Sequence, residues 1–501
     1  MRYRHFVLAA SFLVAAALPT FAADFHVATT GSDTTGTGSA AAPWATINHA
    51  LASVPAGSTI LVAPGTYNGR VRLDDGPSPL VLRSEVPYQA RLRNTDVVVT
   101  CYTCRSVTLE GFDIAHSGPG AGALVIQIQD LIGSPGGEMA VSFVTLRNNV
   151  IHDSWNNDLV KINNGARDIT VEGNLFYNQS GSDEHIDINS VEGVIVRENV
   201  FFNDFAGSGR PVGNDTSSYV VIKDSNGTDD SYLGAENITV ERNIFLHWEG
   251  SSGSNFLLVG EDGQPYFEAH GVAIHSNLFL GDSANTMRAV FGVKGGQGID
   301  FHYNTVVGDL PALAFAFRFN TEGDNPPNDI LHLVGNVWSD PTGTMGAGGG
   351  GGNDFSDTPP GQTTSLWTLS RNLYWNGGAA IPADAGELIN YTADTLRLVA
   401  DPLLPSLAGV VPPRWDAGTG LFADGSRTIR QVFLNLARYG QPAAGSPARG
   451  AGEWSFAPPL DLRGYRRIGT SVPSLGASEA VVVFADDFER GHLDAWSTVV
   501  P

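Results

Sequence analysis

Four acidic residues and one lysine stand out because their types and spacing suit metal and proton chemistry. Asp158 is followed 25 residues later by Asp183, then come Glu184 and Asp187, and Lys223 lies further along the chain. Calcium in proteins takes six to eight oxygen ligands at about 2.3–2.6 Å, and carboxylates supply them. If these acids lie on neighbouring turns of one repeated structure, they can share a single ion. The sequence therefore predicts a calcium site formed by the four acids.

A second interpretation of the same residues needs no metal. In it the acids form a solvated acidic turn, and Lys161 makes an ion pair with Asp187 on the next turn. Four carboxylates so close together without a cation would repel one another, and some would be protonated. Lys223 also has an interpretation without a chemical role, in which it is a solvated charge on an exposed strand. Both interpretations stay open at the level of the sequence.

The elements that must position these residues are short strands of a repeated coil. One phrase recurs, in which apolar and polar residues alternate, an asparagine follows, and an apolar pair resumes. Its copies end at Asn149, Asn174, Asn199, Asn243, Asn277, Asn304, Asn336 and Asn372. Phe112 occupies the same slot in an earlier copy. Period-two alternation around a sharp bend predicts an all-β fold, a single-stranded right-handed parallel β-helix solenoid.

Stacking of the coils fixes which residues become neighbours. Equivalent residues lie about 4.8 Å apart, so the asparagine side chains can hydrogen-bond to one another in a ladder. We expect each asparagine to adopt the left-handed backbone conformation at the bend, which this residue type tolerates. Strict alternation in the strand before each phrase points Lys161 and Asp187 outward in one column. Lys223 and Lys294 form the next outward column, which Arg318 extends.

The chain divides into four predicted parts. They are a signal peptide (1–23), the β-helix with its N-terminal helical cap (24–400), a closing segment of the β-helix (401–480) and a C-terminal tail (481–501). The signal peptide is indicated by basic residues followed by an apolar run and small residues. Trp44, Ile47, Leu51 and Val54 fall on one face of a short helix ahead of the first strands. Such a helix would cover the open end of the stack.

Composition narrows the possible partners. With 59 glycines, 28 prolines and 16% charged residues, the chain suits a turn-rich β protein. Its net charge of -23 argues against DNA or RNA, because phosphate binding depends on Lys and Arg. An acidic polysaccharide stays possible, since a few local cations or a bridging metal ion can hold it. No later apolar run is long enough to span a membrane, and we expect a secreted monomer, extracellular or periplasmic.

Cys101 and Cys104 are the only cysteines. In an oxidising compartment the simplest interpretation is a local disulfide. A fully extended strand would hold the two Cα atoms about 10 Å apart, so a bridge requires a turn between them. Zinc would need more ligands than two cysteines supply.

Two terminal stretches resemble known proteins. The segment from Phe25 through Tyr67, with its Pro43-Trp pair, resembles the N-terminal cap of pectate-lyase-like bacterial β-helix proteins. Gly445-Ser-Pro-Ala448 and Asp461-Leu-Arg-Gly464 resemble the closing motif of the same broad group. With the coils, the resemblance covers most of residues 24–480. Motifs of this kind identify an architecture and not a substrate.

The acidic set resembles the site of the calcium-dependent pectate lyases of the ninth polysaccharide lyase family. Those enzymes use an aspartate on one coil, an Asp-Asp-x-x-Asp group on the next, and a base lysine one coil further. This sequence has Asp158, then Asp183-Glu-His-Ile-Asp187, then Lys223. The resemblance implies that the acids hold calcium and that Lys223 is the base. Glu184 departs from the pattern by replacing an aspartate, and His185 stands where a small residue is usual.

These implied roles amount to β-elimination in a uronate-containing, pectate-like polysaccharide. The base removes the proton at C5 of a uronate, and charge builds on the adjacent carboxylate, where calcium acts as a Lewis acid. Lys223 must lose its proton first, although a lysine has a reference pKa of about 10.4. A neighbouring cation and partial desolvation both lower that pKa. The candidate substrate-binding residues are Lys161, His185, Lys294 and Arg318.

Two other functions stay open. A non-catalytic carbohydrate-binding or cell-surface β-helix protein would use the same long face and retain a glycan uncut. A glycoside hydrolase would use paired carboxylates and yield reducing ends without unsaturation. A lyase would instead yield an unsaturated product that absorbs in the ultraviolet. The separation of the carboxyl groups decides between hydrolytic geometries, and spacing in the sequence does not give it.

Overall fold

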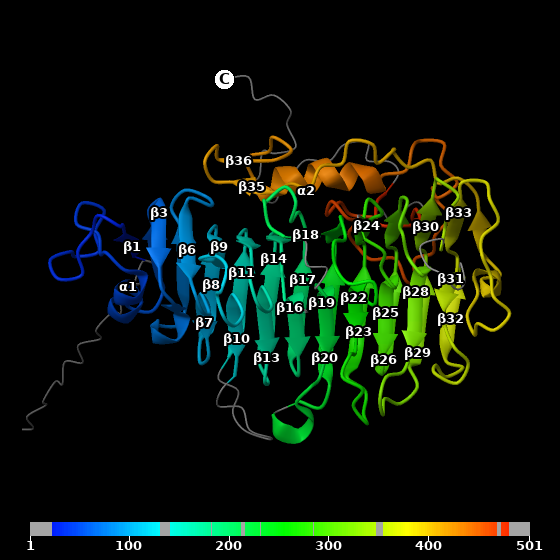
Figure 1. The fold of residues 1–501 in the computed structure, drawn as a ribbon, viewed down its shortest axis with the longest axis horizontal. Coiled ribbons are helices and arrows are strands. Elements are labelled where there is room, and N and C mark those ends of the chain that lie inside the picture. Colours follow the sequence, from blue (N-terminus) through cyan, green and yellow to red (C-terminus); the bar gives the residue numbers. More distant parts are fainter. Residues whose placement is uncertain are drawn as a thin grey trace, which may run out of the picture.

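The computed structural model describes residues 23–130, 141–181, 183–211, 216–230, 232–283, 285–346, 354–467 and 472–479. Within these ranges the chain winds as a right-handed parallel β-helix, with its coils stacked along the long axis of Figure 1. The predicted fold class is confirmed. The predicted signal peptide, apart from its last residue, and the predicted C-terminal tail lie outside the described residues.

Each full coil adds one strand to each of three parallel sheets. Among the described residues the first sheet has 12 strands, which are β1 (Asp24–Val27), β2 (Ser58–Val62), β5 (Leu80–Ser84), β8 (Arg105–Glu110), β11 (Ser142–Arg147), β14 (Arg167–Glu172), β17 (Glu192–Arg197), β20 (Ala235–Glu241), β23 (Ala269–His275), β26 (Gly296–His302), β29 (Asp329–Val334) and β32 (Trp367–Ser370).

The chain passes from the first sheet to the second at the repeated asparagine. The second sheet also has 12 strands in the described part of the chain, which are β3 (Gly65–Asn68), β6 (Ala90–Asn94), β9 (Asp113–His116), β12 (Val150–His152), β15 (Leu175–Tyr177), β18 (Val200–Phe202), β21 (Ile244–Phe245), β24 (Leu278–Leu280), β27 (Thr305–Val307), β30 (Val337–Asp340), β33 (Leu373–Asn376) and β34 (Leu398–Val399).

The third sheet completes the coil. Its 10 strands within the described ranges are β4 (Val71–Arg72), β7 (Val99–Cys101), β10 (Ile126–Gln129), β13 (Val160–Asn163), β16 (Glu184–Asn189), β19 (Ser218–Lys223), β22 (Asn255–Val259), β25 (Ala289–Lys294), β28 (Ala314–Asn320) and β31 (Asp354–Asp357). Outside the three sheets lie two helices, α1 (Ile47–Ser53) and α2 (Ile429–Ala437), the hairpin β35 (Trp415–Asp416) and β36 (Leu421–Phe422), and 3₁₀ turns at Leu73–Asp75, Gly227–Asp229, Tyr391–Ala393 and Arg438–Gly440.

The predicted asparagine ladder is present and its side chains are fully buried. Asn174 is typical: its side-chain amide donates to Asn199 Oδ1 at 3.1 Å and to the Leu146 carbonyl at 2.9 Å. Its backbone N–H donates to the same Asn199 Oδ1 at 2.8 Å. At one end Phe112 N–H donates to the Asn149 side chain, as its place in the repeat predicts. Because an amide has both donors and an acceptor, each asparagine satisfies its neighbour.

The conformation expected for these asparagines was wrong. The residue with positive φ is the one immediately before each ladder position: Gly111, Asn148, Gly173, Glu198, Arg242, Ser276, Tyr303, Gly335 and Arg371. The chain therefore turns one residue earlier, and the turn directs the next side chain inward. Asparagine is required at the ladder position for its hydrogen bonds and not for a left-handed backbone.

The N-terminal end is capped as predicted. Helix α1 covers the first coils (Figure 1), and Trp44, Ile47, Leu51 and Val54 are all buried in the core that runs through the solenoid. The helix is shorter than predicted, because Trp44 precedes it and Val54 is its C-cap. Thr46 caps the helix by accepting a hydrogen bond from the His49 backbone N–H. The apolar face therefore forms the cover that a stack of repeats needs at its end.

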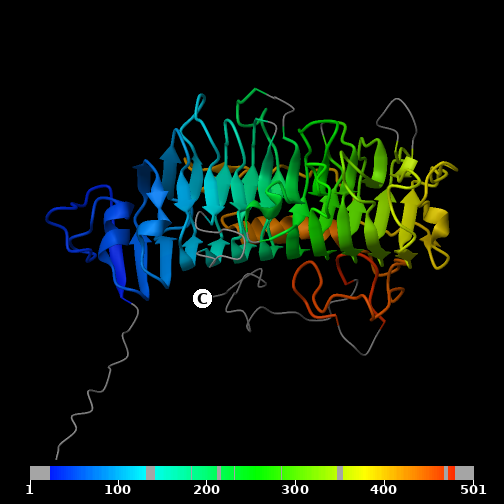
Figure 2. The same cartoon turned by 90° about the horizontal axis from the view of Figure 1, so that it is seen from below.

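The predicted closing segment comprises residues 401–480. Its described part runs along the flank of the solenoid, where α2 lies beside the second sheet (Figures 1 and 2). Val432 and Phe433 of α2 pack with outward apolar residues of that sheet, including Phe202 and Ile244. Those strands carry apolar residues on both faces, so the outer face must be covered as well as the inner one.

Two further expectations concern the cysteines and the membrane. Cys101 and Cys104 form a disulfide with their Cα atoms 5.5 Å apart, across a bend at the end of β7. The turn that the sequence requires for this bridge is therefore present. Among the described residues no helix has the length and apolar character of a membrane span.

Candidate functional site

The candidate acids lie at the entry of strands of the third sheet, whereas Lys223 and Lys294 are the last residues of β19 and β25. At the entry two consecutive residues point into the core, as Leu159 and Val160 do in one coil and Tyr219 and Val220 in a later one. Strict alternation therefore fails at this corner. The outward residue before each such pair forms a column that contains Asp158, Glu184, Ser218 and Asn255.

The whole sequence contains only three lysines, Lys161, Lys223 and Lys294. All three lie on the third sheet, in β13, β19 and β25. Each makes an ion pair: Lys161 with Asp187 at 2.5 Å, Lys223 with Glu261 at 2.5 Å, and Lys294 with Glu322. The other permanently charged cations of the protein are arginines, which do not release a proton near neutral pH, so every lysine amine of the chain lies on this sheet.

Asp158, Asp183 and Glu184 bring carboxylate oxygens within 4.8 Å of one another. Asp158 is fully buried and Glu184 is 2% exposed, whereas Asp183 reaches solvent. Asp158 Oδ1 accepts a hydrogen bond from the Glu184 backbone N–H at 3.0 Å, which fixes the two coils against each other. Two oxygens bound to one calcium ion at about 2.5 Å can be at most about 5 Å apart, so this spacing suits a shared ion.

The electrostatics of the cluster are those of crowded acids. Burial and repulsion from Asp187 raise the pKa of Asp158 to about 7, against the attraction of Lys161. Burial and the same neighbour raise the pKa of Asp183 to about 6. The pKa of Glu184 is raised well above its usual range by burial and by Asp158. Without a cation these groups hold protons that ordinary carboxyls would have released.

The residues present fit a cation. Asp158 Oδ2 and Asp187 Oδ1 are buried oxygens that accept no hydrogen bond within the described structure, and such atoms are costly unless a ligand satisfies them. The fit is best for Asp158, Asp183 and Glu184, because Lys161 Nζ is 2.5 Å from Asp187 Oδ2 but 3.9 Å from Asp158 Oδ2. The ion pair between Lys161 and Asp187, expected from the metal-free interpretation, is therefore present beside the cluster.

Lys223 lies among carboxylates that the sequence did not identify. Its Nζ is 2.5 Å from Glu261 and 3.6 Å from Asp262, in the bend after β22. Burial alone would lower the pKa of Lys223, but Asp187, Glu261 and Glu184 raise it well above its usual range. A general base must give up this proton, so the surrounding charge has to change before Lys223 can act.

Glu268 holds the bend that carries Glu261 and Asp262. It is fully buried, and its two carboxylate oxygens accept hydrogen bonds from the backbone N–H groups of Glu261, Asp262, Gly263 and Gln264. This bend lies outside the repeated phrase, so the repeat gave no means of finding it. The only signal was the Asp262-Gly263 dipeptide, which marks a turn.

His185 is not available to a substrate. Its ring is fully buried, stacks on Tyr219 at 4.4 Å and hydrogen-bonds to the Asn203 side chain at 3.0 Å. Burial lowers its pKa to about 3, so it is neutral near pH 7. The prediction of an outward His185 was wrong because Ile186 and His185 are one of the consecutive inward pairs at this corner.

Arg318 and Lys294 belong to different columns. Lys294 pairs in register with Asn320, whereas Arg318 pairs with Gly292, which continues the column of Lys161 and Asp187. The predicted extension of the Lys223 column by Arg318 was therefore wrong by two residues. Arg318 Nε also makes an ion pair with Asp357 at 2.8 Å.

The stacked coils define the class of fold, which is a right-handed parallel β-helix. Residues 29–88 match the model of a protein of unknown function, DUF1565. That match spans the helical cap and the first coils. No curated protein sequence matches the chain significantly.

Several solved structures are similar. XylC in complex with xylose has 12% identity and a TM-score of 0.45, covering 76% of this chain and 87% of that one. Pectate lyase Pel9A has 14% identity and a TM-score of 0.48, covering 92% and 97%. A mannuronic acid specific family 6 polysaccharide lyase from human gut microbiota has 15% identity and a TM-score of 0.41, covering 70% and 81%. Likenesses at this level bear on neither reaction nor substrate.

Proposed function

We propose that the protein is a secreted polysaccharide lyase, which cleaves a uronate-containing polymer by calcium-assisted β-elimination. The observation that carries this proposal is the group formed by the buried Asp158 and Glu184 and the half-buried Asp183, with oxygens within 4.8 Å of one another beside Lys223. Three carboxyl groups this close together suit a cation, and the neighbouring lysine, one of three in the chain, suits a base.

In this mechanism Lys223 removes the proton at C5 of the uronate. Its ion pair with Glu261 must open first, and the carboxylates that raise its pKa must be neutralised. Calcium held by Asp158, Asp183 and Glu184 would neutralise Glu184 and add a positive charge near Lys223, and it would act as a Lewis acid on the substrate carboxylate. Lys161, Lys294 and Arg318 would exchange their present ion pairs for flanking uronate carboxylates.

The test is a substrate screen with pectate, alginate and glycosaminoglycans, each with calcium or with a chelator. Ultraviolet absorbance of an unsaturated product is expected with calcium and is lost with the chelator. Reducing ends without absorbance would instead indicate a glycoside hydrolase and would contradict the lyase proposal. Glycan retention without cleavage under every metal condition would indicate a carbohydrate-binding protein.

The role of Lys223 is tested by two variants. Lys223→Ala should lower kcat by about 10²–10⁴-fold, the usual contribution of a general base. Lys223→Arg keeps the charge and can still pair with Glu261, but it cannot deprotonate near neutral pH. It should be as inactive as Lys223→Ala while matching the wild type in thermal stability. Activity retained in Lys223→Arg would assign Lys223 to charge alone.

A further inference from the structure

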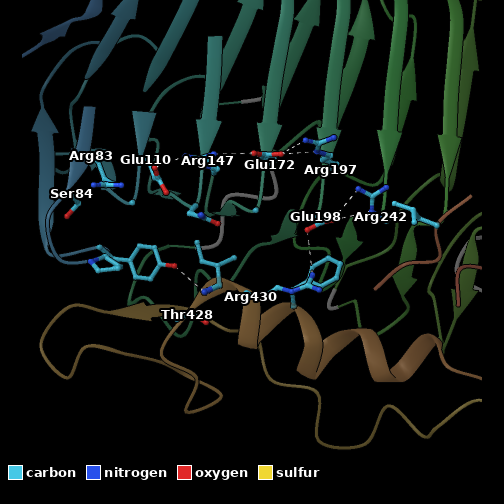
Figure 3. Close-up of a pocket in the computed structure, with 18 residues that line it drawn as sticks. Arg83, Ser84, Glu110, Arg147, Glu172, Arg197, Glu198, Arg242, Thr428 and Arg430 are labelled. Atoms are coloured by element: carbon cyan, nitrogen blue, oxygen red, sulfur yellow. Dashed lines mark hydrogen bonds and ion pairs between the residues drawn. The ribbon is translucent and has the colours of Figure 1, made fainter. Parts of the chain in front are cut away.

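A second concentration of charge lies away from the third sheet, where the strands of the first sheet end. A cavity of about 570 Å³ opens there between the coils and α2 (Figure 3). Sites for small organic ligands have volumes of about 300–1,000 Å³. The cavity is therefore large enough for a small organic molecule, and an inorganic ion would leave most of it empty.

One wall of the cavity is a row of alternating charges. Arg83, Glu110, Arg147, Glu172 and Arg197 occupy equivalent positions on five successive strands of the first sheet, and Figure 3 shows them side by side. Arg147 lies between two glutamates, 2.8 Å from Glu110 and 4.0 Å from Glu172, and Arg197 binds Glu172 at 2.6 Å. These ion pairs use both glutamates of the row, and Arg83, at its N-terminal end, has no glutamate left to bind.

The first arginine of the row has no protein partner. Glu110 is engaged by Arg147, and the Arg83 side chain makes no hydrogen bond or ion pair within the described ranges. Arg147 Nε is also buried without a hydrogen-bond partner in that part of the chain. Guanidinium groups with free donors recognise carboxylates through paired hydrogen bonds.

The cavity differs in charge from the rest of the molecule. The whole chain has 52 acidic residues and 29 basic ones, but the lining contains five arginines and three glutamates: Arg83, Arg147, Arg197, Arg242, Arg430, Glu110, Glu172 and Glu198. The N-terminus of α2, at Thr428 and Ile429, contributes further positive potential. The cavity therefore attracts an anion although the protein as a whole repels one.

The opposite wall is apolar. Tyr88, Ile429 and Phe433 line it, and Tyr88 is held in place because its hydroxyl accepts the Ile429 backbone N–H at 3.2 Å. A matching ligand needs a carboxylate for the arginines, hydroxyl donors for the glutamates and a C–H face for this wall. A uronic acid sugar has all three.

We propose that this cavity is a second carbohydrate site, which binds a uronic acid sugar through Arg83 and Arg147. The site is separate from the acids and lysines of the third sheet, and the proposal does not depend on lyase activity. At this site the protein would bind an acidic sugar without a metal ion.

The test uses the full chain with Lys223→Ala in the presence of a chelator, so that the third-sheet site does not turn over substrate. Galacturonate and galactose differ by a single carboxylate, and their binding is compared by titration calorimetry or ligand-detected NMR. Galacturonate should bind, and galactose should bind about tenfold more weakly or not at all. Equal binding of the two sugars would overturn the proposal.

Two variants locate the site. Arg83→Ala should weaken galacturonate binding about tenfold, because a charge-assisted pair is lost. Arg83 is exposed and without a side-chain partner, so this variant keeps the fold. Arg72→Ala, an exposed arginine on β4 of the third sheet, is the matched control and should leave binding unchanged. Unchanged binding in Arg83→Ala, or displacement of galacturonate by an equal concentration of inorganic sulfate, would overturn the proposal.

Discussion

The asparagine ladder and the acids of the third sheet are both buried stacks of polar side chains, and they are satisfied in opposite ways. In the ladder, Asn199 accepts hydrogen bonds from Asn174 and donates to Asn243. In the acidic stack, Asp158 and Glu184 lie on adjacent coils and both carry only acceptors when ionised. The ladder is complete in itself, whereas the acids need a proton or a cation from outside.

This difference shows what stacking can and cannot do in a solenoid. Coils bring equivalent residues to about 4.8 Å, which suits an amide because each side chain presents a donor to one neighbour and an acceptor to the other. The same spacing forces like charges together. A column of identical polar residues is therefore structural when they are amides and is a candidate binding site when they are carboxylates.

The largest effect is expected from breaking the ladder in its middle. Asn199→Ala removes the acceptor for Asn174 and the donor for Asn243 and the Val171 carbonyl. Each buried group left unpaired costs about 1–3 kcal/mol, so the loss of unfolding free energy should be about 3–5 kcal/mol in chemical denaturation. Asn156→Ala, at an exposed asparagine, is the control and should change the unfolding free energy by less than about 0.5 kcal/mol. A loss below about 1 kcal/mol in Asn199→Ala would contradict the view that the ladder is complete only when intact.

The same contrast explains what the sequence could reveal. The ladder was predictable because its asparagines recur at the same place in a repeat. The same repeat also identified Phe112 as the residue that takes the asparagine position in the first copy. The C-terminal end of the ladder was not predictable, because Asn372 donates to Asp394, which lies outside the repeat. Residues that lie in bends, such as Glu261, were missed for the same reason. A repeat predicts contacts between its own copies and says nothing about loops that fold back onto them.

A second prediction concerns His152, a buried residue of the second sheet whose ring lies between two carboxylates. His152 binds Asp113 and Asp153 at 2.8 Å each. Burial alone would lower the pKa of His152, but the two carboxylates raise it. A raised pKa means that its stabilisation is fully present below the unfolded pKa of about 6.5 and is lost as the pH rises through the folded value. His152→Phe should cost about 2 kcal/mol at pH 6 and less at higher pH.

His185→Phe provides the matched comparison for that experiment. The pKa of His185 is lowered to about 3, so its folded form is neutral and the wild-type protein loses stability as the pH falls below about 6.5. The cost of His185→Phe should therefore shrink toward low pH, opposite to that of His152→Phe. Thermal unfolding from pH 5 to pH 9 measures both. Parallel pH profiles for the two variants would contradict the assignment of their charge states.

The smallest effect has the opposite sign and bears directly on the acids. In calcium-free protein, Glu184→Gln should raise the unfolding free energy by about 1 kcal/mol, because an amide is neutral without taking up a proton and also supplies a donor. Added calcium should raise the melting temperature of the wild type, since a ligand that binds only the folded state stabilises it. It should not raise that of Glu184→Gln. Glu322→Gln, which alters an exposed partner of Lys294, should keep the calcium response. If Glu184→Gln instead lowered the unfolding free energy of the calcium-free protein, as is expected for Asn199→Ala, the hydrogen-bonding needs of the acids would be met within the protein. The acidic stack would then not differ from the asparagine ladder.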